Sequence, residues 1–304
     1  MKTRSLVNAA IMLAIYMVFF VLYYIGVLPT IMSILLPIPL IIYSVMTDKL
    51  SDMMWLLIGC FIGTGLLGSV YGLVTTLNYG VMGAIIGIGI LKKWPYWQRL
   101  LNAAIVSIIA YPLMIYVVSG ISLQESMTQI IQEVFAEMQS MSVLPEASLA
   151  MLTTMEQSMM SMFTTLLPTL LLLIGLLWAF LSDKLAMFIL KRMNYELPSS
   201  GNIQKFQLGA TLAVIYLGSQ LMSLFISNHT INVILMNIIM LLNTLFLVQG
   251  LIVAMAYFKS RNQKGFGIFV IIFALMSSLS MFISVLGVTD ALFDYRERFA
   301  VKRS

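Results

Sequence analysis

The feature that most constrains this chain is a succession of apolar runs, each about 20 residues long, separated by short polar segments. A helix of about 20 residues crosses the hydrocarbon core of a bilayer. Because lipid offers no hydrogen-bond partners, the backbone groups of a spanning segment must bond one another, as they do in a helix. The sequence therefore predicts an all-α fold, a polytopic transmembrane helical bundle of about eight or nine spans. The runs lie near residues 6–25, 28–46, 53–69, 71–91, 100–119, 163–182, 206–227, 231–258 and 266–288.

A low content of charged residues supports the same class. Of the 304 residues, 61% are hydrophobic and 10% are charged, whereas soluble domains average about 45 to 50% apolar and about 25% charged residues. The net charge of +5 would suit nucleic acid if the basic residues formed one patch. They lie instead mostly in alternate loops, so we expect the lipid bilayer as a partner and no nucleic acid.

The positions of the basic residues predict the orientation of the chain. Cytoplasmic loops are enriched in Lys and Arg, and here the basic loops alternate with loops that contain neither residue. The basic loops are centred on Lys49, Lys92, Lys184 and Lys259. We therefore expect a cytoplasmic amino terminus in the cell (plasma) membrane. Nine crossings would place the basic tail, residues 296–303, outside, so either the second or the last run does not fully cross, or the tail tolerates the outer face.

A polar interruption at residues 120–162 divides the fifth run from the sixth. It carries acidic residues and no basic one, which predicts an outer location. Its apolar residues recur at helical spacing in two stretches, so we expect two amphipathic helices that form an external cap or lie on the lipid surface. The linker signal at residues 194–205 separates six runs from three. We expect one membrane domain, 1–304, made of five spans in 1–119, the extracytoplasmic insertion 120–162, and the remaining spans and basic tail in 163–304.

Two segments are candidates for a ligand-binding site. The second run contains Pro37 and Pro39, and proline removes backbone hydrogen bonds that lipid cannot replace. Interrupted helices build substrate sites in transporters, although a merely kinked helix is an equal alternative. In the fourth run, Asn78 and Tyr79 precede a glycine-rich stretch whose G-x-x-x-G spacings favour close helix packing. We predict that these four residues contact a small-molecule ligand.

The first run contains a smooth patch that suits a partner helix. Ala10 and Ala14 lie one helical turn apart, and small residues at this spacing allow close approach of two helices. Packing inside the protein is the commoner use of such a pair. Docking of a partner is the alternative that we predict here.

Residues that carry chemistry are scarce. Asp48, Asp52, Asp183 and Asp290 lie at the ends of runs, so mid-membrane charge is not expected. Cys60 is the single cysteine, and phosphate-binding, zinc-binding or nucleophile motifs are absent from the sequence. We expect no enzyme, no catalytic residue, no metal and no cofactor. Met151, Met155 and Met159 share one helix face, which leaves Cu(I) binding as a minor alternative.

Four segments carry a family resemblance: SLVNAAIMLAIYMVF near the amino terminus, LPIPLIIY, NYGVMGAIIGIGIL and LGVTDALFDYRER near the end. Together they resemble the YybS-like family of uncharacterised bacterial multi-pass membrane proteins. The amino-terminal half of that family distantly resembles the S components of energy-coupling-factor transporters. Those components bind small solutes through about six spans and dock onto a membrane coupling protein with ATPases. The resemblance implies that Ala10 and Ala14 belong to the docking face.

These patterns support two hypotheses for function. The first is a small-solute binding or transport component. The alternative is a membrane assembly or regulatory protein that acts through helix–helix contacts and cytoplasmic loops, including Lys92, Lys93 and Arg99.

Overall fold

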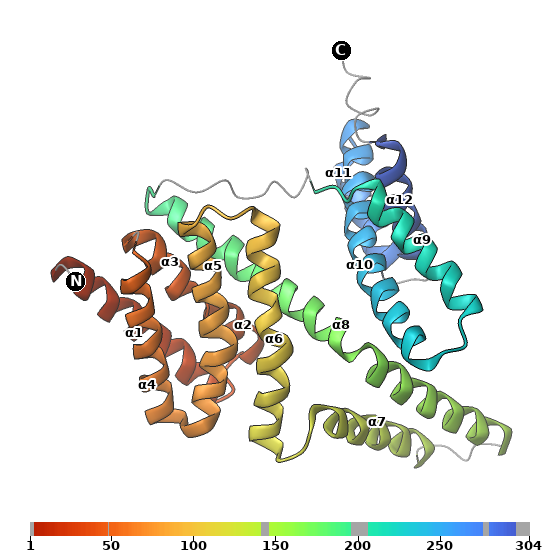
Figure 1. The fold of residues 1–304 in the computed structure, drawn as a ribbon, viewed down its shortest axis with the longest axis horizontal. Coiled ribbons are helices and arrows are strands. Elements are labelled where there is room, and N and C mark those ends of the chain that lie inside the picture. Colours follow the sequence, from red (N-terminus) through yellow and green to blue (C-terminus); the bar gives the residue numbers. More distant parts are fainter. Residues whose placement is uncertain (1–2, 48, 141–145, 196–205, 276–279, 296–304) are drawn as a thin grey trace. The chain divides into compact units, whose positions relative to one another are not determined.

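The computed structural model describes residues 3–47, 49–140, 146–195, 206–275 and 280–295. Within these ranges every regular element is a helix (Figure 1). Six of the helices are long and apolar enough to cross a membrane. The fold class is therefore confirmed as an all-α, multi-pass membrane protein.

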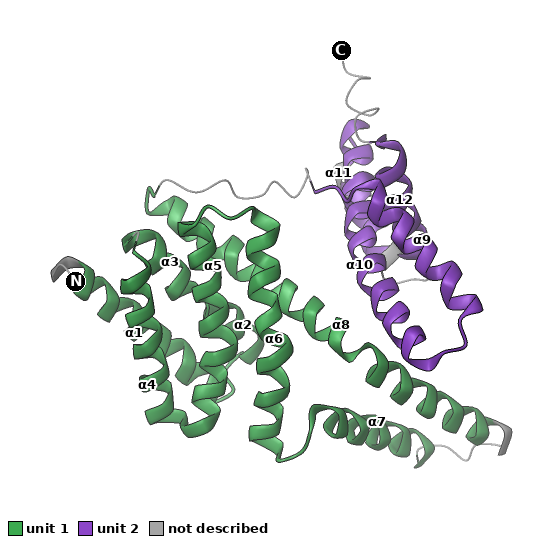
Figure 2. Ribbon diagram, in the orientation of Figure 1, with its two compact units in different colours: residues 1–200 green, residues 201–304 purple. Residues whose placement is uncertain are grey.

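The chain divides into two compact units, unit 1 at Met1–Ser200 and unit 2 at Gly201–Ser304 (Figure 2). The boundary falls within the predicted linker, although residues 196–205 lie outside the described residues. So do Asp48 and the tail at 296–303. The description of the whole chain as one membrane domain stays a prediction.

Unit 1 begins with α1 (Thr3–Tyr24), followed by α2 (Pro29–Leu35) and α3 (Ile38–Thr47). The break between α2 and α3 is the one expected from the prolines. Without its usual helical partner, the Ile34 carbonyl accepts a hydrogen bond from the Ser182 hydroxyl at 2.8 Å. A neighbouring helix thus repairs part of the break, as the absence of water in the membrane requires.

The next segment is a helical hairpin. It contains α4 (Leu50–Thr75), η1 (Thr76–Gly80) and α5 (Val81–Leu91). Its two arms are joined by a sharp reversal inside α4 and not by a separate loop. The chain reverses at Ser69, which has φ 52° and ψ −139°. Thr64 and Thr76 then face each other across the hairpin with hydroxyl oxygens 2.8 Å apart. Residues 50–91 therefore provide two crossings, as the sequence predicts.

The remainder of unit 1 contains α6 (Tyr96–Ser119), α7 (Leu123–Ser140) and α8 (Glu146–Arg192). The helix α7 is the first of the two expected amphipathic helices. The second is not separate, because α8 runs for 47 residues from the insertion into the sixth apolar run. Its Pro168 lies inside the helix without ending it. At about 1.5 Å per residue, α8 is about 70 Å long, which exceeds the bilayer core.

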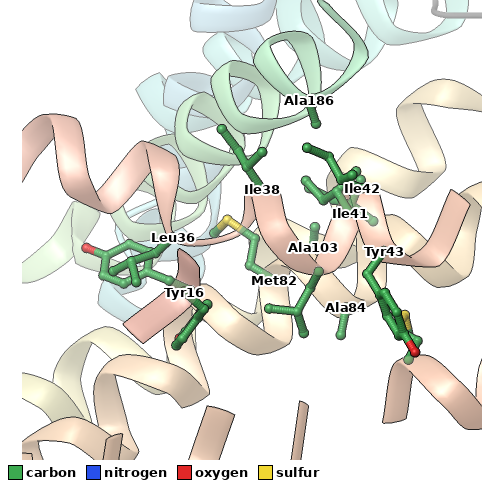
Figure 3. Packing of buried hydrophobic residues seen from close by; sticks show 14 of the residues in the cluster. Tyr16, Leu36, Ile38, Ile41, Ile42, Tyr43, Met82, Ala84, Ala103 and Ala186 are labelled. Carbon is green, nitrogen blue, oxygen red and sulfur yellow. The ribbon is translucent and has the colours of Figure 1, made fainter. Parts of the chain in front are cut away.

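The core of unit 1 joins α1, α3, α4, α5, α6 and α8, and Figure 3 shows part of it. Glycine allows a close contact at the proline break, because a Cβ atom on Gly83 would collide with the carbonyl oxygen of Pro37. The predicted close packing of the glycine-rich helices is therefore present. The labelled core residues are Tyr16, Leu36, Ile38, Ile41, Ile42, Tyr43, Met82, Ala84, Ala103 and Ala186.

Unit 2 contains α9 (Ala210–Phe225), α10 (His229–Ser260), α11 (Lys264–Leu275) and α12 (Ser280–Phe293). The sequence leaves open whether the run at 266–288 fully crosses, and the structure places two short helices of different direction in it. At about 18 and 21 Å, neither is long enough to cross the core alone.

Contacts with α10 give the two directions. After the turn at residues 261–263, α11 folds back on α10, with the Phe258 and Phe266 ring centroids 5.9 Å apart. The helix α12 runs parallel to α10, because Asn243 pairs with Ser284 and Gln249 pairs with Asp290, each 41 positions apart. Within the described residues, α11 and α12 therefore run in opposite directions along α10.

Candidate functional site

The candidate site is centred on η1, a single turn of π-helix that carries Asn78 and Tyr79. The Val81 N–H reaches the Thr76 carbonyl, five residues back, and this widens the turn. Such turns are rare and occur frequently at functional sites. Both predicted side chains are enclosed, with Asn78 1% exposed and Tyr79 3% exposed.

A chain of buried hydroxyl groups joins η1 to α1 and α4. The Tyr16 hydroxyl donates to Thr76 Oγ1 at 3.1 Å, and Thr64 Oγ1 donates to the Cys60 carbonyl at 2.8 Å. Since each hydroxyl has one hydrogen, Thr76 must donate to Thr64. On the other side of η1, Ser107 of α6 donates to Asn78 Oδ1 at 3.1 Å. We call Tyr16, Thr64, Thr76, Asn78 and Ser107 the polar belt.

Aromatic rings lie beside the belt. Tyr79 meets Tyr23 edge to face with ring centroids 5.7 Å apart, and Tyr23 stacks on Tyr71 at 6.3 Å. Tyr24 packs against Tyr71 at 5.6 Å. These rings provide apolar faces next to hydroxyl and amide groups, which is the composition of small-molecule sites.

The structure brings two of the predicted segments together. Gly83, one turn after Tyr79, lies against the backbone of Pro37, so the break in the second run faces the start of α5. Pro37 and Pro39 are both buried. The four predicted residues therefore belong to one packed interior, and a solute would reach Asn78 only after the helices separate.

Ala10 and Ala14 lie elsewhere, on the outer face of α1. Both are exposed, whereas Met12, Tyr16 and Phe20 on the opposite face are buried. The alanine pair is thus not used for packing inside unit 1. Docking of a partner helix on this face stays a prediction.

Comparison with known proteins identifies the family. The model of the DUF2232 family, described as predicted membrane protein, matches residues 13–291. The chain belongs to this family. It is 24% identical over 310 residues to the "Uncharacterized protein YybS" of Bacillus subtilis strain 168, with 98% of this chain and 99% of that protein covered. No solved structure matches the chain. The resemblance to a YybS-like membrane family is confirmed.

This DUF2232 member also buries charges that the sequence places at run ends. Arg99 Nη2 lies 2.8 Å from Asp183 Oδ1, and the two side chains are 2% and 0% exposed. Asp52 is buried and accepts a hydrogen bond from Ser5 at 2.6 Å. Arg99 and Asp183 are 84 positions apart, so their pairing follows from helix packing rather than from any local pattern.

Unit 2 has its own buried polar contacts. Gln249 donates to Asp290 Oδ2 at 2.8 Å and accepts from the Leu208 N–H at 2.8 Å. At the surface of the unit, Gln207 donates to Asp294 at 2.7 Å. Asp290 is fully buried, so its position near the end of an apolar run does not place it in water.

The burial of Arg99 corrects one part of the alternative hypothesis. Lys92 and Lys93 are exposed at the turn between α5 and α6, as a docking loop requires. Arg99 is enclosed and paired, so it is unavailable for a partner. Its side-chain stem lies against Gly89, where an added Cβ atom would come within 2.6 Å.

The methionine face predicted outside the membrane is present on α8. Met151, Met155 and Met159 are 67%, 51% and 40% exposed. Among the described residues, no group of three His, Cys, Asp or Glu side chains is placed to hold a metal ion. Cu(I) binding by these thioethers stays a prediction.

Proposed function

We propose that the protein is a small-solute binding or transport component of the membrane, and that unit 1 binds the solute at the polar belt. The observation that carries this proposal is the π-helical turn η1. It holds Asn78 and Tyr79 in the membrane interior, opposite the broken helix at Pro37.

The cost of this arrangement supports a functional role. Helix breaks and buried polar groups in a membrane interior require partners, and a regular apolar bundle would avoid them. Here a π-turn, a proline break and a hydroxyl chain occur together in one packed region. Separation of these helices would expose amide and hydroxyl groups beside tyrosine rings, so a small polar solute with an apolar part is the ligand that fits.

Resemblance to the S components supplies the proposed partner. Unit 1 contains about six crossings, the number typical of those components. In this proposal the exposed Ala10 and Ala14 face docks onto a membrane coupling protein with ATPases. Close helix contact through small residues would hold the two proteins together.

Thermal stability in detergent tests solute binding. A ligand that binds only the folded state raises the melting temperature as its concentration rises. We expect one member of a panel of vitamins and small metabolites to do so. Asn78→Ala should abolish the shift, whereas Asn102→Ala, a matched change on α6 outside the belt, should retain it. A panel without any stabilising compound, or equal shifts in both variants, would count against the polar belt as the site.

Copurification from the native membrane tests the docking face. Ala10→Leu and Ala14→Leu should remove a coupling protein with its ATPases, because bulky side chains prevent close approach. The exposure of both positions leaves unit 1 able to fold. Val18→Leu, on the same exposed face outside the small-residue pair, is the control. Retention of the partner by both alanine variants would exclude this face.

The assembly or regulatory role keeps a specific observation in its favour, the exposed pair Lys92 and Lys93. If these lysines recruit a partner, Lys92→Ala with Lys93→Ala should remove a copurifying protein that Asn78→Ala retains. The opposite result would support solute binding.

A further inference from the structure

A buried ion pair in unit 1 is incompletely hydrogen-bonded. Arg99 lies in the first turn of α6, and Asp183 lies in α8, where the two side chains meet at 2.8 Å. Three buried polar atoms of this cluster have no hydrogen-bond partner among the described residues: Arg99 Nε, Asp183 Oδ2 and the Tyr96 hydroxyl. An ionised carboxylate with an unsatisfied oxygen is costly in a protein interior.

The groups around Asp183 are few. Arg99 and Lys184 both lie over the ring of Tyr96, with Arg99 Cζ at 5.3 Å and Lys184 Nζ at 4.9 Å from its centroid. Lys184 also lies 5.8 Å from the Phe180 centroid. The cations favour the ionised carboxylate, whereas burial favours the neutral acid.

The other helices packed on α8 add little charge. The sequences of α2 and α5 contain no ionisable side chain, and α3 contains only Tyr43, whose hydroxyl contacts Ser5. The helix α7 meets α8 around Phe163, far from Asp183 along the helix. In the part of the chain that the structure describes, Tyr96, Arg99 and Lys184 are therefore the titratable groups that face Asp183.

We infer that Asp183 is a proton-binding site and that its protonation releases α6 from α8. A proton from water binds Oδ2 and forms a carboxylic acid, while the charge-assisted hydrogen bond from Arg99 Nη2 breaks. Arg99 keeps its charge and extends toward the polar surface, which its long side chain and its place in the first helical turn allow. The new O–H group also gives Oδ2 a hydrogen to donate.

Release of α6 would reach the polar belt. Ser107, which bonds Asn78, is two turns along α6 from Arg99. Proton binding at Asp183 would therefore loosen the helix that closes the belt. This inference goes beyond the proposed function, since it requires no solute and no partner.

Infrared difference spectroscopy during a pH titration tests the site directly. We expect acidification to produce the carbonyl stretch of a buried carboxylic acid. Asp183→Asn should lose it. Asp52→Asn, a matched change at another buried carboxylate, should retain it. Asp183→Glu keeps an acid at the site and should shift the titration midpoint. A band that survives Asp183→Asn would overturn the inference. The absence of any band while the protein stays folded would also overturn it, and this is the result expected if bound water satisfies these atoms.

Spin-label distances test the release of α6. Exposed positions Gln98 on α6 and Phe188 on α8 can carry labels after substitution by cysteine in a Cys60→Ser background. The distance should increase on acidification and be independent of pH in Asp183→Asn. A pH-dependent distance in Asp183→Asn, or an unchanged distance in the parent protein, would contradict the release.

Discussion

The two units place their polar groups differently. In unit 1 the polar belt crosses the interior and joins α1, α4, η1 and α6 through side-chain hydroxyls and an amide. In unit 2, Gln249 joins the segment before α9 to α12. Hydrogen bonds in the polar belt join mainly one side chain to another. Gln249, in contrast, also accepts a hydrogen bond from the Leu208 N–H, which has no helical partner.

Glycines also serve the two units differently. In unit 1, Gly83 admits the backbone of a broken helix at Pro37. In unit 2, Gly250 and Gly287 bring two parallel helices together, because added Cβ atoms would lie 1.9 Å from the carbonyl oxygens of Ile283 and Phe246. The comparison indicates that unit 1 is built around an interruption and unit 2 around close helix contact.

The largest expected effect concerns the side of the carboxyl terminus. If α11 and α12 enter and return, a reporter fused after Ser260 and one fused to the end of the chain must lie on the same side. From the charge pattern we expect this side to be the cytoplasm. Reporter activity or cysteine labelling from each side measures it. Opposite sides for the two fusions would show that the last apolar run crosses the membrane.

Glycine substitutions should destabilise each unit separately. Gly83→Ala and Gly287→Ala force helix displacement, which typically costs about 1–3 kcal/mol. Thermal unfolding measures the loss, and limited proteolysis shows which unit opens. Gly218→Ala, where nothing lies within 4 Å, is the control and should be neutral or slightly stabilising. Simultaneous opening of both units in either variant would show that the two fold as one.

Hydropathy and charge predict much of this fold because each span must satisfy its own backbone. Eight of the expected runs correspond to α1, α2 with α3, the Ser69 hairpin, α6, α8, α9 and α10. The sequence predicts the return of the last run only as one of several alternatives, because the hydropathy of this run is the same in either direction. Its only sequence signal is the basic tail, which conflicts with nine crossings.

The site was predictable only in part. Asn78 and Tyr79 stand out as polar residues in an apolar run, and Pro37 as a helix breaker. Thr64, Thr76 and Ser107 do not stand out in the sequence, because Ser and Thr side chains bond their own helix backbone in many membrane helices. The Arg99 and Asp183 pair depends on the packing of distant segments, and each residue alone matches a cytoplasmic end.

Removal of a single polar group should destabilise unit 2 more than unit 1. Gln249→Leu leaves the Leu208 N–H unpaired and removes a hydrogen bond to Asp290, so a loss of about 1–3 kcal/mol is expected. Ser107→Ala removes one interhelical hydrogen bond, with a typical value of about 0.6 kcal/mol. Chemical denaturation in detergent compares the two. A larger effect for Ser107→Ala would show that the polar belt contributes more to stability than the Gln249 contacts do.

The smallest effect concerns the start of α7, outside the spans. Glu125 accepts hydrogen bonds from the Ser122 N–H and hydroxyl at 2.8 Å each, and Ser122 Oγ accepts from the Glu125 N–H at 3.1 Å. This capping box stabilises the helix start.

Those two bonds, the backbone one first, lower the pKa of Glu125 below its ordinary value. A lowered pKa means that the folded helix prefers the ionised carboxylate, so the stabilisation is present above the unfolded pKa and is lost as pH falls through the folded one. Amide hydrogen exchange of the first turn of α7 should therefore accelerate on acidification beyond its intrinsic pH dependence. Glu125→Gln should remove that extra dependence, while Glu133→Gln, in the same helix beyond the cap, should retain it. An identical profile in Glu125→Gln would exclude the carboxylate as its source, and the helix start would then depend on the Ser122 hydroxyl alone.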